Sequence, residues 1–167
     1  MATTRQQLSM FVPALVPALA AVELERVRSI VDPVQSSLIP AHITLCREDE
    51  ISDFPPIRQR LQHLVLPPIT LTFGVAEVFS GHGLILHCIE GEPAFLQLRE
   101  YILASSNIKT QRPHLTLAHP RNPKAPGNSL AATACLPNPL QISFTSICLI
   151  EQEGSGPWRV LERYALR

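Results

Sequence analysis

The sequence predicts an α+β fold made of two similar halves. A four-residue phrase occurs twice in the chain, as His42-Ile43-Thr44-Leu45 and as His114-Leu115-Thr116-Leu117. Each copy lies in an apolar run typical of a strand, with helix-like and strand-like segments before and after it. Strands and helices do not alternate regularly, which argues against a doubly wound parallel sheet. We therefore expect two related halves, each contributing one copy of the phrase.

The first half begins with a strand from Gln7 to about Leu15, and Pro17 is well placed to open a helix. That helix has an apolar stripe with steps of four, three and four residues, formed by Ala20, Leu24, Val27 and Val31. We expect solvent around its charged residues, which are Glu23, Glu25, Arg26 and Arg28. Pro33 and Pro40 then bracket a predicted loop.

The first histidine strand follows this loop and ends at the acidic run 48–50. Asp53 is placed to cap a second helix. The apolar stripe of this helix is formed by Phe54, Ile57, Leu61 and Leu64. The pair Pro67-Pro68 should end it.

A β-hairpin is predicted next, with strands from Ile69 to Phe79 and from Leu84 to Ile89 around a turn at 80–83. Pro93 then opens a third helix, which ends at 105–107. The apolar side of this helix is formed by Phe95, Leu98 and Ile102.

The second histidine strand is followed by a loop over 121–128, which is rich in Pro, Lys and Asn. The chain then continues as one strand from Leu140 to Ile150 and a turn over 154–157. A last strand runs from Trp158 to Leu166.

Each repeated phrase presents one imidazole and one hydroxyl on the same face, because side chains on a strand alternate with a period of two. His42 would lie beside Thr44, and His114 beside Thr116. Two such pairs across a cleft supply two titratable nitrogens and two hydroxyl donors, which suits acid and base catalysis on a phosphodiester. The alternative is a purely structural role, which is common for a histidine on a strand.

Composition limits the kind of ligand and the compartment. The 14 basic and 14 acidic residues cancel, so a small phosphate ester or an RNA terminus fits better than a long polyanion. The 4 cysteines show no CxxC spacing, which predicts reduced thiols and a cytoplasmic protein. Residues 10–22 loosely resemble a signal peptide, but their prolines favour a strand and a helix instead. No run reaches the ~18 apolar residues of a membrane span, so we expect no membrane partner.

The two motifs resemble those of a known family. Pro40-Ala41-His42-Ile43-Thr44-Leu45 and Arg112-Pro113-His114-Leu115-Thr116-Leu117-Ala118 are similar to the paired motifs of the 2H phosphoesterases. This superfamily includes the bacterial 2′-5′ RNA ligase-like proteins and the 2′,3′-cyclic phosphodiesterases of RNA or nucleotides. The resemblance in the order of elements covers nearly the whole chain. It implies one bilobal α+β domain over 1–167, with antiparallel sheets in two pseudo-symmetric lobes around a central groove.

The resemblance also implies roles for the motif residues. His42 and His114 would be the catalytic pair, and Thr44 and Thr116 the phosphate-binding hydroxyls. One neutral imidazole would deprotonate water while the other, protonated, neutralises the departing ribose oxygen. A near-symmetric pair does not reveal which is which. No metal or other cofactor is expected, because hydroxyls and an imidazolium can bear the phosphoryl charge.

Two more residues are candidate substrate ligands. Arg112 shares the strand face of His114 if the strand extends through Pro113. Cys46 shares the face of His42 if that strand stays regular, which would place the thiol in the pocket wall.

The chain departs from the family pattern after the second motif. Many relatives carry a basic residue there, whereas this chain has Ala118 and His119, and regular alternation would point His119 away from His114. Other basic residues near the motif could receive a phosphate or remain solvated, and they are Lys109, Arg121 and Lys124.

The sequence also contains residues suited to two other kinds of site. Trp158, Tyr101 or a Phe could stack on a nucleobase, with core packing as the alternative. A zinc site is disfavoured because the pairs with matched spacing, His82 with His87 and His114 with His119, fall on opposite strand faces.

The sequence therefore predicts a metal-independent phosphodiesterase that hydrolyses 2′,3′-cyclic phosphates of nucleotides or RNA ends. The resemblance implies a 2′-phosphate product. Two alternatives stay open: a hydrolase or RNA ligase-like enzyme acting on 2′-5′ linkages, and a nucleotide- or RNA-binding protein without turnover. The expected partner is a small nucleotide or an RNA terminus, and we expect a monomer.

Overall fold

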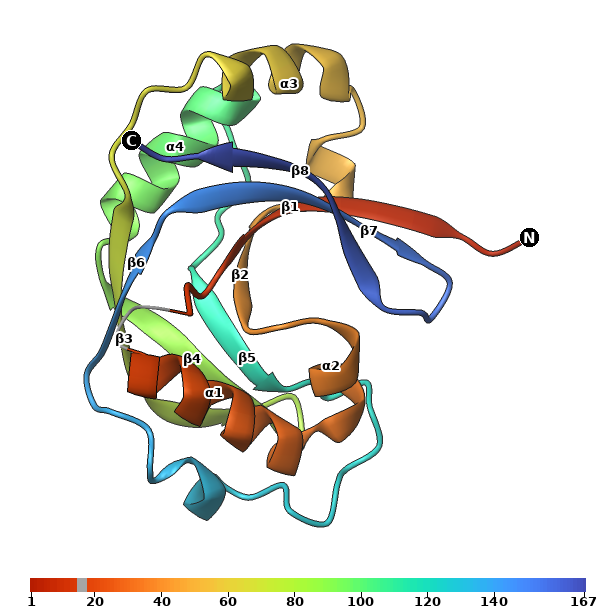
Figure 1. The fold of residues 1–167 in the computed structure, drawn as a ribbon, viewed down its shortest axis with the longest axis vertical. Coiled ribbons are helices and arrows are strands. Elements are labelled where there is room, and N and C mark those ends of the chain that lie inside the picture. Colours follow the sequence, from red (N-terminus) through yellow and green to blue (C-terminus); the bar gives the residue numbers. More distant parts are fainter. Residues whose placement is uncertain (15–17) are drawn as a thin grey trace.

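The chain folds into two four-stranded antiparallel sheets with helices packed around them, as seen in a computed structural model that describes residues 1–14 and 18–167 (Figure 1). The first sheet has the order β2-β1-β7-β8, with bounds Thr4–Phe11 for β1, His42–Cys46 for β2, Ser146–Glu153 for β7 and Trp158–Ala165 for β8. The second has the order β5-β4-β3-β6, with bounds Ile69–Phe79 for β3, Gly83–Glu90 for β4, His114–Ala118 for β5 and Leu140–Phe144 for β6. The expected α+β class with two similar lobes and antiparallel sheets is confirmed.

The two histidine strands occupy corresponding places. β2 is the edge strand of the first sheet and pairs with β1, and β5 is the edge strand of the second sheet and pairs with β4. The two edges contact each other near the centre of the molecule (Figure 1). The fold thus brings together two phrases that are far apart in the chain.

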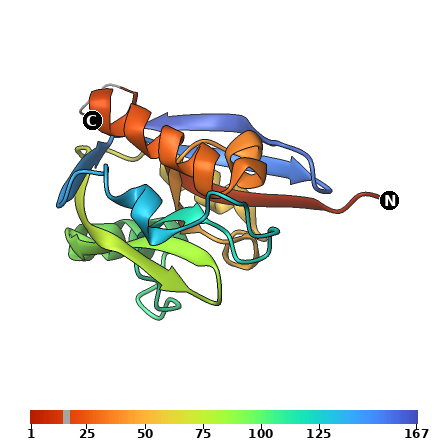
Figure 2. The ribbon, with the colours of Figure 1, turned by 90° about the horizontal axis from the view of Figure 1, so that it is seen from below.

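The helices cross over between the lobes. The α-helices within the described residues are α1 Ala18–Val31, α2 Pro33–Leu38, α3 Phe54–Gln62 and α4 Glu92–Leu103. α1 follows a strand of the first sheet but packs on β5, while α4 follows a strand of the second sheet and contacts β2 of the first sheet as well as β3 of its own and α3. Figure 2 shows α1 lying along one side of the molecule. This exchange ties the two lobes to each other.

The apolar stripes predicted from the sequence form the core. The stripe of α1 is buried throughout, as are Phe95, Leu98 and Ile102 of α4. One cluster of buried side chains contains residues of both sheets, including the edge-on pair Phe73 and Phe144, whose ring centres are 6.5 Å apart. No helix in the described part of the chain is long and apolar enough to cross a lipid bilayer.

The predicted strand from Leu140 to Ile150 is in fact two strands in different sheets. β6 ends at Phe144 and belongs to the second sheet, whereas β7 begins at Ser146 and belongs to the first. Burial alternates along β6 but is continuous from 147 to 152, because β7 lies in the interior of its sheet. The break at Thr145 is where the chain passes from one lobe to the other.

The predicted loop between Pro33 and Pro40 contains the short helix α2. Pro33 takes its first position, and the Asp32 carboxylate accepts a hydrogen bond of 3.0 Å from the Gln35 backbone N–H, as an N-cap does. The prediction that Arg28 is exposed to solvent is wrong, because this side chain is buried.

Several predicted boundaries shift. α3 ends at Gln62, before the proline pair, and β1 ends at Phe11. The predictions that fall on Leu15 and Pro17 lie outside the described residues.

Candidate active site

The two motifs have the same local geometry. In β2 and in β5 the His and Thr side chains are half-buried, while the aliphatic residues between them are buried. Alternation along a strand that faces the core on one side explains this pattern. The imidazole and hydroxyl of each phrase therefore lie on the face turned away from the core.

Both imidazoles are oriented by the same hydrogen bond. His42 Nδ1 lies 2.9 Å from the Pro40 carbonyl oxygen, and His114 Nδ1 lies 2.9 Å from the Arg112 carbonyl oxygen. A carbonyl can only accept, so Nδ1 must carry the proton in each ring. In the neutral imidazole Nε2 is then the nitrogen able to take a proton, which makes each ring a base at the same atom.

The surroundings lower the pKa of both histidines. Burial lowers the pKa of His42 to about 4, and the positive charge of Arg28 acts in the same direction, against the hydrogen bond to Pro40. Burial also lowers the pKa of His114, with a further contribution from His87. At neutral pH both rings are therefore neutral in the free protein.

The two threonines differ in their neighbours. The Gln7 side-chain amide lies 2.9 Å from the Ser9 hydroxyl and 3.5 Å from Thr44 Oγ1, where it donates a hydrogen bond. Because Thr44 accepts that bond, its own hydroxyl proton remains available to a ligand. Thr44 is opposite the polar Ser9 on the neighbouring strand, whereas Thr116 is opposite the buried, apolar Ile85.

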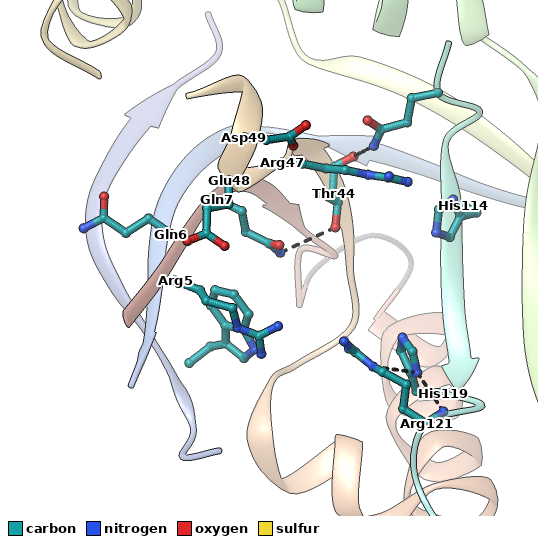
Figure 3. Close-up of a pocket in the computed structure, with 12 residues that line it drawn as sticks. Arg5, Gln6, Gln7, Thr44, Arg47, Glu48, Asp49, His114, His119 and Arg121 are labelled. Atoms are coloured by element: carbon teal, nitrogen blue, oxygen red, sulfur yellow. Dashed lines mark hydrogen bonds between the residues drawn. The ribbon is translucent and has the colours of Figure 1, made fainter. Parts of the chain in front are cut away.

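A cavity of about 640 Å³ opens beside the motif strands, and Thr44 and His114 line it (Figure 3). His42 and Thr116 are not among its lining residues, although they lie half-buried on the same strands. The remaining lining residues are Arg5, Gln6, Gln7, Arg47, Glu48, Asp49, Gln111, His119, Arg121 and Trp158.

Positive charge dominates the cavity. Three arginines, Arg5, Arg47 and Arg121, contribute to its wall (Figure 3). Of the two lining carboxylates, Asp49 is paired with Lys109, which lowers the pKa of Asp49. The electrostatics favour an anionic ligand such as a phosphate.

A buried arginine holds the chain leading into the first motif. Arg28 of α1 donates to the Ile39 carbonyl at 2.7 Å and to Glu25 at 2.8 Å, and Glu25 accepts from the Ala41 backbone N–H at 2.6 Å. The residues just before His42 are therefore fixed at both a carbonyl and an amide.

A second buried arginine, Arg99 of α4, links the end of the first motif to the chain that leads into the second. It donates to the carbonyls of Leu45, at the end of β2, and of Lys109, ahead of β5, and it forms an ion pair of 2.7 Å with Glu50. Gln111 adds a bond of 2.7 Å to the Thr44 carbonyl. Sequence reasoning missed both buried arginines, because their partners lie far away in the chain or on the backbone.

His119 lies in the cavity wall with His114, contrary to the expectation that it points away. Strand pairing stops at Ala118, so the alternation does not extend to His119. The His119 backbone N–H donates to the buried Asp32 carboxylate at 2.8 Å, and His119 Nδ1 accepts from Arg121 Nε at 3.2 Å. The only sequence signal for Arg121 was its place near the second motif.

The two other candidates lie away from the cavity. The Arg112 guanidinium is exposed and donates to the Cys88 carbonyl at 3.1 Å, so its backbone carbonyl rather than its charge contacts His114. Cys46 is fully buried in the core. A bulge in β2 opposite Leu8 and Ser9 breaks the alternation that would have kept Cys46 on the face of His42.

The other candidate sites are not assembled. Tyr101 lies on α4, and neither it nor His63 or His82 lines this cavity. The rings of His63 and His82 bond to the backbone carbonyls of Gln59 and Asn122. Across residues 1–14 and 18–167, no group of three or more His, Cys, Asp or Glu side chains is arranged to hold a metal ion.

Comparisons with known proteins agree with the fold. A sequence model of the 2′-5′ RNA ligase superfamily matches residues 16–156. A comparison with curated proteins gives no match. Among solved structures, E. coli LigT in its apo form is similar with a TM-score of 0.60 at 18% identity, over 98% of each chain.

Two more solved structures have the same fold. E. coli LigT complexed with NADP+ gives a TM-score of 0.60 at 17% identity over 99% of each chain. A protein described as a phosphoesterase gives 0.59 at 18% identity over 98% of each chain.

Proposed function

Because the chain belongs to the 2′-5′ RNA ligase superfamily, we propose that it is a metal-independent phosphodiesterase that hydrolyses 2′,3′-cyclic phosphates of nucleotides or RNA ends. One observation carries the proposal. Two imidazoles on contacting edge strands are held by identical Nδ1 hydrogen bonds, so each has Nε2 as its reactive nitrogen. Two such nitrogens suit a displacement at phosphorus in which one proton is removed and another is delivered.

The pKa values support an assignment of roles. His42, with its pKa lowered to about 4, stays neutral and serves as the base. The pKa of His114 is also lowered, but a bound phosphate anion beside it opposes that shift, and His114 serves as the acid. Water attacks phosphorus and its proton passes to His42 Nε2. The bond from phosphorus to O3′ breaks, and His114 Nε2 gives its proton to O3′, which leaves a 2′-phosphate.

Hydroxyls and arginines support the charge that develops on the phosphoryl oxygens. Thr44 accepts from Gln7 and can donate its own proton to a phosphoryl oxygen. Thr116 occupies the matching place on β5. Arg47 lines the same cavity as Thr44 and adds positive charge near His114.

A second candidate reaction is hydrolysis or ligation of a 2′-5′ linkage by the same residues. The observation that favours it is the extent of the cavity, which continues from Thr44 and His114 to Arg5 and Arg121. Such a cavity has room and charge for a second nucleotide beyond the reacting phosphate.

The test is hydrolysis of the four 2′,3′-cyclic mononucleotides and of a 2′-5′-linked dinucleotide, all in EDTA, with the product isomer identified. We expect turnover of at least one cyclic nucleotide to its 2′-phosphate. His42→Ala and His114→Ala should lose this turnover. His63→Ala is their matched control, because His63 is exposed and its Nδ1 also bonds to a carbonyl, that of Gln59. Turnover of the 2′-5′ dinucleotide alone would favour the second reaction. Nucleotide binding without turnover would contradict both.

A further inference from the structure

The wall of the cavity also contains an aromatic and cationic surface that the reaction itself does not use. Arg5 lies with its guanidinium carbon 5.6 Å from the centre of the Trp158 ring. Both residues line the cavity that contains Thr44 and His114. Trp158 is the only tryptophan in the sequence. The surface formed by Arg5, Gln152 and Trp158 is called the Arg5–Trp158 platform below.

The sheet builds this platform from three neighbouring strands. Arg5 of β1 pairs in register with Gln152 of β7, and Gln152 pairs in register with Trp158 of β8. Residues directly opposite each other in an antiparallel sheet point to the same face. The three side chains therefore form a row across the sheet, and Arg5 is placed over Trp158 by the strand register.

Hydrogen bonds hold these three side chains in place and leave the positive charge of Arg5 without a carboxylate partner among the described residues. Arg5 donates to the Gln152 side-chain oxygen, and the Gln152 amide nitrogen donates to the Gly156 carbonyl at 2.8 Å. Gln152 itself is buried. The partner of Arg5 is thus a neutral amide, and the ion pairs found within residues 1–14 and 18–167 do not include Arg5.

Two other arginines, Arg58 and Arg159, provide a comparison, because a carboxylate neutralises the charge of each. Arg58 lies 4.9 Å from the centre of the Phe54 ring, but its charge is neutralised by Glu162 at 2.6 Å. Arg159, the residue after Trp158, is paired with Glu151 at 2.5 Å. Unlike these two, Arg5 keeps its charge unpaired against an aromatic ring in the wall of the candidate active site.

A phosphate needs hydroxyls, imidazoles and guanidinium groups, but it gains nothing from the flat apolar face of an indole. A nucleobase does, because bases stack on aromatic rings and on guanidinium planes. We infer that the Arg5–Trp158 platform is the nucleobase subsite of this cavity, and that its ligands are nucleotides rather than phosphate esters without a base. The inference rests on the proposed function, since it places the base of the same substrate whose phosphate reaches His114.

The test uses the single tryptophan as a reporter. The protein is titrated with 2′-AMP and with inorganic phosphate while Trp158 fluorescence and the His114 imidazole NMR signals are followed. We expect 2′-AMP to change both signals, and inorganic phosphate to change the His114 signals with little effect on fluorescence.

Variants show whether the platform supplies affinity. Arg5→Gln and Trp158→Leu should weaken 2′-AMP binding at least about fivefold, which corresponds to the lower end of the ~1–3 kcal/mol typical of one stacked base. Trp158→Leu removes no charge, so it should bind inorganic phosphate much as the wild type does, and the phosphate titration also verifies that this variant is folded. Arg159→Gln is the matched control, because it removes the same charge from the neighbouring residue, and it should bind 2′-AMP normally.

The outcomes separate this inference from the proposed function. If 2′-AMP shifts the His114 signals but leaves fluorescence unchanged, and both platform variants bind it normally, the base lies elsewhere and only this inference is overturned. If 2′-AMP changes neither signal, both are overturned. If fluorescence changes and His114 does not respond, the platform binds a nucleotide outside the reaction centre, which contradicts the proposed function and the link between the two sites.

Discussion

The lowered pKa of His42 should make the stability of the protein depend on pH in a specific way. Burial lowers this pKa from 6.5 to about 4, so the folded protein binds fewer protons than the unfolded chain between these two values. Stability is therefore lost as the pH falls below about 6.5. At ~1.36 kcal/mol per pKa unit, the full cost is about 3 kcal/mol, of which about 2 kcal/mol falls between pH 7 and pH 5. Since His42 is only half-buried, we expect about 1–2 kcal/mol in that interval.

The assay compares urea unfolding of the wild type and of His42→Gln at pH 7 and at pH 5. The variant should lose about 1–2 kcal/mol less than the wild type over this interval, because other titrating groups are common to both proteins and cancel. His63→Gln, which changes an exposed histidine, should behave like the wild type. If NMR gives the His42 ring a pKa near 6.5, and the free energy of unfolding depends on pH equally in both proteins, the reasoning about burial is refuted.

Three further predictions concern the neighbours of the motifs. Arg99→Met should destabilise the fold by about 3–5 kcal/mol in urea unfolding, because Glu50 and the backbone carbonyls around it lose their buried cation. Arg26→Met, on the exposed face of α1, should cost far less, and equal losses would contradict the role of burial. His87→Gln should raise the pKa of His114, because His87, whose ring centre is 6.3 Å away, lowers it; an unchanged NMR titration of His114 would count against this coupling. Thr44→Val should reduce kcat about 10²-fold with little change in urea stability, and an unchanged kcat would remove Thr44 from the reaction.

The sequence was sufficient to predict strands whose residue pattern is local. The bounds predicted from Ile69 to Phe79 are those of β3, whose buried residues all lie between 69 and 73, where the apolar and polar residues alternate in the sequence. The histidine phrases were placed on strands for the same reason.

Features that depend on distant partners could not be predicted in this way. The apolar run around Thr145 gives no sign that its two halves join different sheets, because both halves are buried. The direction of His119 depends on where strand pairing ends, and that end is set by the partner strand β4. The burial of Arg28 depends on a backbone carbonyl after the next helix, which no helical periodicity contains. The Arg5–Trp158 platform is likewise a product of register across three strands.

The measurement that tests the central claim most directly is the rate of 2′,3′-cyclic nucleotide hydrolysis in EDTA for the wild type, His42→Ala, His114→Ala and the double variant. Loss of a general acid or base should lower kcat by ~10²-fold or more in each single variant. Because the two imidazoles act in one step, the double variant should fall by much less than the product of the two single losses. Turnover that survives either single substitution, or wild-type turnover that disappears in EDTA and returns with a metal ion, would contradict the two-histidine mechanism.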